Sequence, residues 1–173
     1  SDYYLRWNFK KEKNIKQMPP GILFKRYDIL KKHNYNKILM ISGTANCYPN
    51  KIQSPSISGQ IINMVKLWNN FYAKLDEDKK KFFKFRPHTA DFWNIKNFFS
   101  ERHGTSILSS EKKFKNDIKN SKIIINTSFS TPFFETMSSG RPTIVLLNES
   151  FFSISDEKRE LINEFYNNQI LFD

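Results

Sequence analysis

The stretch of residues 121–148, SKIIINTSFSTPFFETMSSGRPTIVLLN, most constrains what this chain can fold into. It contains two short aliphatic runs, at residues 123–125 and 143–147, and each is typical of a strand buried on both faces of a parallel sheet. The polar and apolar residues between the runs have the length of a helix of about two to three turns. The stretch therefore predicts a strand, a helix and a second, parallel strand.

The predicted helix has a marked start and a marked end. Its N-cap is either Ser130 or Thr131, and Pro132 follows at the first helical position, where a missing N–H costs little. Gly140 supplies the C-cap, and Pro142 prevents the helix from continuing. The helix N-terminus and the hydroxyl groups around it lie beyond the C-terminal end of the first strand, so this turn suits a phosphate group.

Other strand and helix patterns alternate along the chain. Strands are predicted at residues 37–42, 82–85 and 105–108, and helices at residues 27–33, 58–75, 92–99, 111–120 and 155–166. The helix at 92–99, capped by Asp91, is expected to bury Phe92, and the last helix is expected to bury Leu161. This alternation predicts an α/β fold with a doubly wound, mostly parallel, Rossmann-like sheet. It would occupy residues 37–173, after a basic, irregular linker or N-terminal extension of residues 1–36.

Composition agrees with one globular domain. The 173 residues include 17 Phe, enough to fill a core. We expect a cytoplasmic location, because the sequence has neither a run of about 18 apolar residues nor a signal peptide. The net charge of +11 comes from scattered lysines without a nucleic-acid-binding motif, so we expect no nucleic-acid partner. Part of this charge would allow peripheral association with the inner face of a membrane. The single cysteine, Cys47, is interpreted as an ordinary loop thiol.

Polar clusters follow the ends of three predicted strands, where ligands bind in parallel α/β sheets. The candidate nucleotide-binding residues are Gly43, Thr44, Thr127, Ser128, Ser130, Thr131 and Glu135, and the candidate catalytic residues are Arg86 and His88. Glu135 lies one helical turn after Thr131, so its carboxylate could accept hydrogen bonds from a pair of ribose hydroxyls. Arg86 and His88 flank a proline and could donate to a diphosphate.

Each of these residues also has a structural interpretation. The hydroxyl cluster could be a helix cap, Glu135 could complement the helix dipole, and His88 could be a surface residue. His33 and His103 are interpreted as surface residues.

Several catalytic and cofactor motifs are absent from the sequence. The three histidines are dispersed and no Asp-x-Asp doublet follows a strand, so no metal site is predicted. A Walker P-loop, a G-x-G-x-x-G loop and a G-x-S-x-G motif are also missing. We therefore expect no cofactor.

Three segments resemble a known group of transferases. Residues 133–145, FFETMSSGRPTIV, resemble the Glu-Ala-Met-Ala-x-Gly-x-Pro-Val-Ile segment in the C-terminal, donor-binding domain of GT-B glycosyltransferases. Phe-Arg-Pro-His at 85–88 and Asn-Thr-Ser-Phe-Ser-Thr at 126–131 are similar to motifs of the CDP-glycerol glycerophosphotransferases, the bacterial polysialyltransferases and the surface-carbohydrate transferases allied to them. Thr136 departs from the usual Ala, and Thr89 stands where those transferases have Pro.

That resemblance implies the C-terminal half of a GT-B fold in a metal-independent transferase of bacterial surface polysaccharide synthesis. Glu135 would hold the ribose, the turn hydroxyls would hold the phosphates, and His88 with Arg86 would neutralise the leaving nucleotide. The donor would be a nucleotide sugar or a CDP-polyol, and a glycan acceptor would bind a separate N-terminal domain. Because the chain begins with Ser rather than Met, we expect a fragment that is inactive by itself.

Two other functions remain open at this point. One is a non-catalytic basic α/β module that binds RNA, a membrane or a protein partner, and a steep salt dependence of RNA binding would favour it. The other is a different nucleotide-using enzyme, such as a sugar-nucleotide epimerase, although the sequence lacks the Gly-rich loop of a dinucleotide site.

Overall fold

The computed structural model of the chain describes residues 4–6, 15–17, 35–44, 59–148, 150 and 154–172. Within the N-terminal 36 residues, β1 (Tyr4–Arg6) and β2 (Ile15–Gln17) pair in parallel as a two-stranded sheet, which differs from the irregular segment expected there. The helix predicted at 27–33, His33, Cys47 and loop residues 45–58 lie outside the described residues.

Among the described residues, the main sheet has five strands, and every pair of neighbours is parallel. They are β3 (Lys37–Ile41), β4 (Phe83–Arg86), β5 (Ser121–Asn126), β6 (Thr143–Leu146) and β7 (Leu171–Phe172), in the spatial order β4-β3-β5-β6-β7. The order reverses between β3 and β5, as in flavodoxin-like doubly wound sheets. This arrangement confirms the predicted α/β, Rossmann-like fold.

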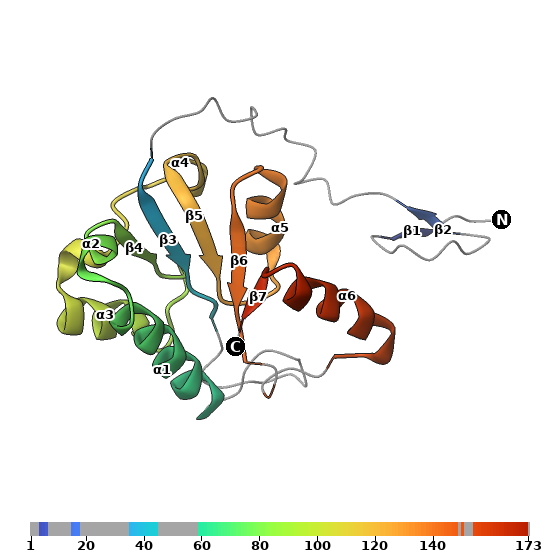
Figure 1. Cartoon of the computed structure of the whole chain (residues 1–173), viewed down its shortest axis with the longest axis horizontal. Helices are drawn as coiled ribbons and strands as arrows, with labels where there is room; N and C mark the ends of the chain where they lie inside the picture. Colours follow the sequence, from blue (N-terminus) through green and yellow to red (C-terminus); the bar gives the residue numbers. More distant parts are fainter. Residues whose placement is uncertain are drawn as a thin grey trace.

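Helices cover both faces of this sheet (Figure 1). They are α1 (Gly59–Ala73), α2 (Glu77–Lys80), α3 (Ile95–His103), the 3₁₀ helix η2 (Thr105–Ile107), α4 (Phe114–Lys119), α5 (Thr131–Ser138) and α6 (Asp156–Asn167). α1 and α3 pack on one face, and α4, α5 and α6 pack on the other.

Successive residues of the strands point to opposite faces, which explains their uninterrupted apolar runs. Met40 packs in one core with Trp68 of α1 and Phe99 of α3, while the preceding Leu39 packs in another core with Ile118 of α4. All five side chains are fully buried. Full burial of an aliphatic or aromatic side chain contributes about 1.5–3 kcal/mol each, so these two layers supply much of the stability of the domain.

The predicted boundaries agree with the structure for most helices and strands. They fail where packing against the rest of the fold determines where an element begins or ends. Residues 105–108 do not form a strand: Gly104, with φ of 82°, ends α3, and the chain then turns through η2. Of the predicted strand, Leu108 alone makes a β-bridge, with Phe85 at the sheet edge. The helix predicted at 111–120 begins only at Phe114. Strand β7 was not predicted.

Three side chains predicted from helical patterns occupy other environments. Phe92 is 57% exposed because α3 begins three residues later, at Ile95. Leu161 is 40% exposed, since α6 buries Ile162 instead. His103 is not a surface residue: its ring is partly buried against Tyr72, with centroids 4.4 Å apart.

Candidate functional site

Three strands of the main sheet end in one row. Ile41 at the end of β3 pairs with Arg86 of β4 on one side and with Asn126 of β5 on the other. The residues that follow each strand therefore lie together at the carboxyl edge, where the strand order reverses. This brings Gly43 and Thr44, the described part of the first predicted cluster, to the same edge as the loops that follow β4 and β5.

The ends of β3 and β5 are tied by the Thr127 hydroxyl. Its Oγ1 accepts a hydrogen bond from the Gly43 backbone N at 2.7 Å and donates to the Ile41 carbonyl at 3.0 Å. Thr127 is only 1% exposed, so this hydroxyl positions the two strand ends. A Cβ placed on Gly43 would lie 3.5 Å from both Thr127 Oγ1 and Ser128 Oγ, at ordinary contact distance. The backbone of Gly43 therefore lies close to the turn that contains Thr127 and Ser128.

The end of β4 is held to β3 in a similar way. The His88 backbone N donates to Ser42 Oγ at 2.9 Å, and Thr44 Oγ1 donates to the Ala90 carbonyl at 2.8 Å. The exposed His88 ring accepts a hydrogen bond from the Ala90 N at Nδ1, 3.0 Å away. In the neutral ring Nε2 then carries the proton, so it is available as a donor.

Ser42 is a site residue that sequence reasoning missed. It was assigned to the predicted strand, yet it is 5% exposed and its hydroxyl fixes the loop that carries His88. The available signal was a serine between the last apolar residue of a buried strand and a glycine, since buried hydroxyls are hydrogen-bonded.

The hydroxyl turn leads directly into α5. Ser130 occupies the N-cap position with extended backbone, as predicted, but its side chain does not cap the helix. Instead its Oγ accepts a hydrogen bond from Ser128 Oγ at 2.9 Å. Ser128 and Ser130 are partly buried and Thr131 is exposed. Three hydroxyls thus surround the positive end of an eight-residue helix.

A second hydrogen bond fixes α5 against β5. Asn126 Nδ2 donates to Thr136 Oγ1 at 2.9 Å, and Thr136 Oγ1 donates to the Phe133 carbonyl at 2.9 Å. Both polar side chains are buried, so this contact sets the position of α5. Partly buried Glu135 precedes Thr136 and lies one helical turn from Thr131.

Arg86 lies in a different environment from the one its predicted role requires. Its guanidinium pairs with Asp117 of α4, donates to the Glu111 carbonyl at 2.8 Å and lies over the Phe114 ring. Asp117 is fully buried, pairs also with Lys37 and accepts from Ser109 Oγ at 2.6 Å. These contacts hold Arg86 toward α4, and this geometry does not favour a direct contact with a phosphate.

The described residues also line hollows away from the carboxyl edge. One of about 410 Å³ lies between α1 and α3, and another, of about 540 Å³, adjoins Ile38, Phe82 and Pro142 near the start of the strands. Across residues 35–44, 59–148 and 154–172, no group of three or more His, Cys, Asp and Glu side chains is arranged for a metal ion. In the same part of the chain, no helix has both the length and the apolar character needed to cross a bilayer.

Comparison with known proteins identifies a family. The model of a family described as LIC12162 family transferase matches residues 1–173. No curated protein and no solved structure matches the chain.

Proposed function

Because the chain belongs to the LIC12162 family of transferases, we propose that its carboxyl edge binds the nucleotide part of an activated donor. The observation that carries this proposal is the meeting of Gly43, the Ser128–Ser130 hydroxyl pair and the N-terminus of α5 at the reversal of strand order. Parallel α/β sheets bind ligands at this point, and a helix N-terminus attracts phosphate. The chain would be the donor-binding domain of a GT-B-like transferase.

In this proposal the turn before α5 binds the phosphates of the nucleotide, and α5 itself binds the ribose. The hydroxyls of Ser130 and Thr131 donate to the phosphates, Ser128 orients Ser130 by donating to its Oγ, and the α5 dipole adds about half a positive charge at its N-terminus. The Glu135 carboxylate, one turn further along, accepts from the ribose hydroxyls. His88 Nε2 donates to the departing nucleotide.

The proposed catalysis is positioning together with stabilisation of the negative charge on the leaving group. Hydroxyls, a helix dipole and one imidazole can supply it without a metal ion, and the turn between β5 and α5 contains no carboxylate that would hold one. We assign Arg86 a positioning role, since its ion pair with Asp117 fixes the end of β4 from which the His88 loop leaves.

The remaining parts of the proposal concern partners. The donor would be a nucleotide sugar or a CDP-polyol, and a glycan acceptor and the catalytic base would belong to a further domain. The transferred group would enter a bacterial surface polysaccharide, with synthesis at the cytoplasmic face of the membrane. The net charge of +11 supports this location, because the cytoplasmic leaflet is anionic.

A binding experiment separates the two ends of the site. Isothermal titration calorimetry should detect CDP, UDP or GDP, and at least one should also raise the melting temperature, because a ligand of the folded state stabilises it. Glu135→Ala should lower the affinity for that nucleoside diphosphate about tenfold, while leaving the affinity for pyrophosphate unchanged. A Ser128→Ala, Ser130→Ala double variant should lower the affinity for both the nucleoside diphosphate and pyrophosphate.

The matched control is Glu160→Ala, which removes an exposed carboxylate from α6. Equal affinity of the Glu135→Ala and Glu160→Ala variants for the nucleotide would contradict the ribose assignment. If no nucleotide binds while RNA binds with a steep salt dependence, the domain is a binding module instead.

A further inference from the structure

The hollow between α1 and α3 has the size of a small-molecule site. Its volume is about 410 Å³, within the range of about 300–1,000 Å³ that ligand pockets occupy. It extends along α1 from Ile61 to Asn70, and a rise of 1.5 Å per residue gives these nine steps a length of about 13.5 Å. None of the described residues that line it belongs to the carboxyl-edge site described above.

One part of this groove is apolar. Ile61 and Val65 of α1 face Trp93, before α3, and Phe98, within it. Ile61 belongs to the buried core, so the groove has a packed floor. Such a wall accepts an aliphatic chain or a flat ring, because removing apolar surface from water is favourable.

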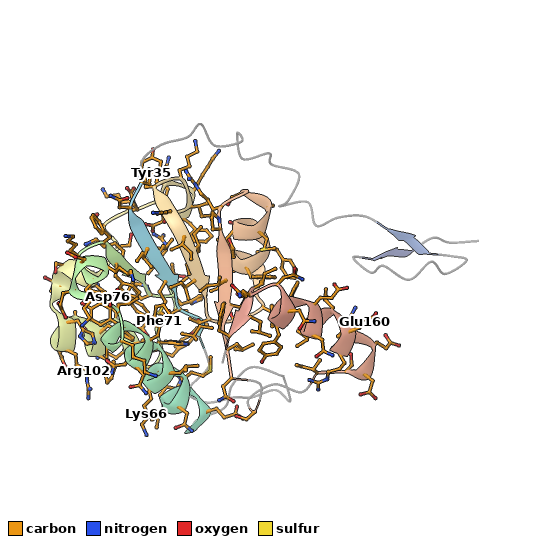
Figure 2. The ribbon with its side chains drawn as sticks, viewed as in Figure 1. Tyr35, Lys66, Phe71, Asp76, Arg102 and Glu160 are labelled. Carbon is orange, nitrogen blue, oxygen red and sulfur yellow. The ribbon has the colours of Figure 1, made fainter. Side chains whose placement is uncertain are left out.

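The charged residues of the groove have one sign. Among the described residues that line it are Lys66 of α1 and Arg102 of α3, and none of these described residues carries a carboxylate. Figure 2 labels both side chains, which project outward on the same side of the molecule. Neither forms an ion pair within the described part of the chain. The Arg102 guanidinium lies 4.5 Å from the centroid of the Phe98 ring, which holds the charge beside the apolar wall.

The amide group of Asn69 in the groove could also donate to an anionic ligand. Asn69 Oδ1 lies 2.8 Å from His103 Nε2, so the amide oxygen is engaged by the imidazole. The amide N–H groups of Asn69 remain as donors. Two cations and an amide donor beside an apolar wall complement an anion that carries an apolar body.

We infer that this groove binds a small anionic amphiphile, an apolar chain or ring that ends in a carboxylate or a phosphate. The apolar part packs against Ile61, Val65, Trp93 and Phe98, and the anionic end lies between Lys66 and Arg102. A neutral apolar ligand provides no anionic group for Lys66 and Arg102, and a cationic ligand is repelled. The inference stands independently of the proposed nucleotide site.

Four probes that have similar alkyl chains but differ in their headgroups test whether the groove requires an anion. Octyl phosphate, octanoate, octanol and octyltrimethylammonium are titrated into the 173-residue chain by calorimetry. At least one of the two anions should bind about tenfold more tightly than octanol, and the cation should not bind. Tighter binding of octyl phosphate points to a lipid-type headgroup, whereas tighter binding of octanoate points to a free carboxylic acid.

Variants then locate the site. Lys66→Gln and Arg102→Gln should each weaken the preferred anion about tenfold, whereas Lys74→Gln, which removes a charge just beyond α1, should not. Val65→Phe, which narrows the groove, should weaken octanol and the anion alike. Melting temperatures near that of the unmodified chain show that each variant is folded. Failure of every probe to bind, equal binding of octanol and both anions, or an equal effect of Lys74→Gln would overturn the inference.

Discussion

Replacing Asp117 with asparagine should lower the free energy of unfolding by about 3 kcal/mol. The carboxylate is fully buried and pairs with Lys37 and Arg86, which are 17% and 19% exposed. Removing one partner of a buried ion pair costs about 3–5 kcal/mol, because a charge is left without compensation. The lower end applies here, since both cations keep some contact with water. For a domain of this length the melting temperature should fall by about 6–12 °C, at about 2–4 °C per kcal/mol.

Urea unfolding followed by circular dichroism measures this loss. Asp78→Asn is the matched control, because it breaks an exposed pair with Lys81 in which Asp78 is 91% exposed, and it should cost no more than about 0.5 kcal/mol. A triple variant with Asp117→Leu, Lys37→Met and Arg86→Met should recover much of the lost stability, since apolar packing often replaces a buried ion pair. If Asp117→Asn is as stable as Asp78→Asn, the cluster does not contribute as argued.

Three further perturbations test the carboxyl edge and the α1–α3 layer. Thr127→Val should cost about 1–3 kcal/mol in urea unfolding, because the Gly43 N–H and the Ile41 carbonyl both lose a buried partner, whereas Thr127→Ser should restore most of it. Gly43→Ala should melt like the unmodified chain but bind nucleoside diphosphate more weakly in calorimetry, since the new methyl group lies 3.5 Å from Ser128 Oγ; unchanged affinity would move the phosphates elsewhere. Burial, and then the neighbouring Arg102 and Lys80, lower the pKa of His103 below its ordinary value of 6.5. The unfolded chain therefore takes up this proton first, so the contribution to stability is complete above pH 6.5 and is lost as the pH falls through the lowered pKa. His103→Gln should reduce the loss of stability on acidification, and an unchanged pH profile would refute this assignment.

Sequence reasoning found the central strands β3, β5 and β6 and also β4 at the sheet edge. β3, β5 and β6 are short runs of aliphatic residues, and burial on both sides of a parallel sheet favours such runs. The segment 105–108 contains only two aliphatic residues, and it follows a glycine with positive φ beside the edge strand and adds only a bridge. β7 was missed because two residues after a turn carry no periodic signal.

The candidate site was predictable as a place and not as a set of contacts. A parallel sheet brings the ends of its strands to one edge, so the meeting of the loops after β3, β4 and β5 followed from topology. The partners of each side chain depend on distant residues. The hydroxyl of Thr127 meets a backbone N–H 84 positions earlier, and Arg86 pairs with a carboxylate 31 positions later. Neither pairing leaves a local sequence pattern.

The pairing of β3 with β5 also bears on how the chain is made. Ile41 pairs with Asn126, so the hydrogen bonds between β3 and β5 form only after 85 further residues have been synthesised. At about 5–20 residues per second, this takes roughly 4–17 s. During that time β4 can cover one side of β3, while the other side presents unpaired N–H and C=O groups that could pair with another chain. The flavodoxin-like strand order therefore gives the nascent chain an open sheet edge until β5 arrives.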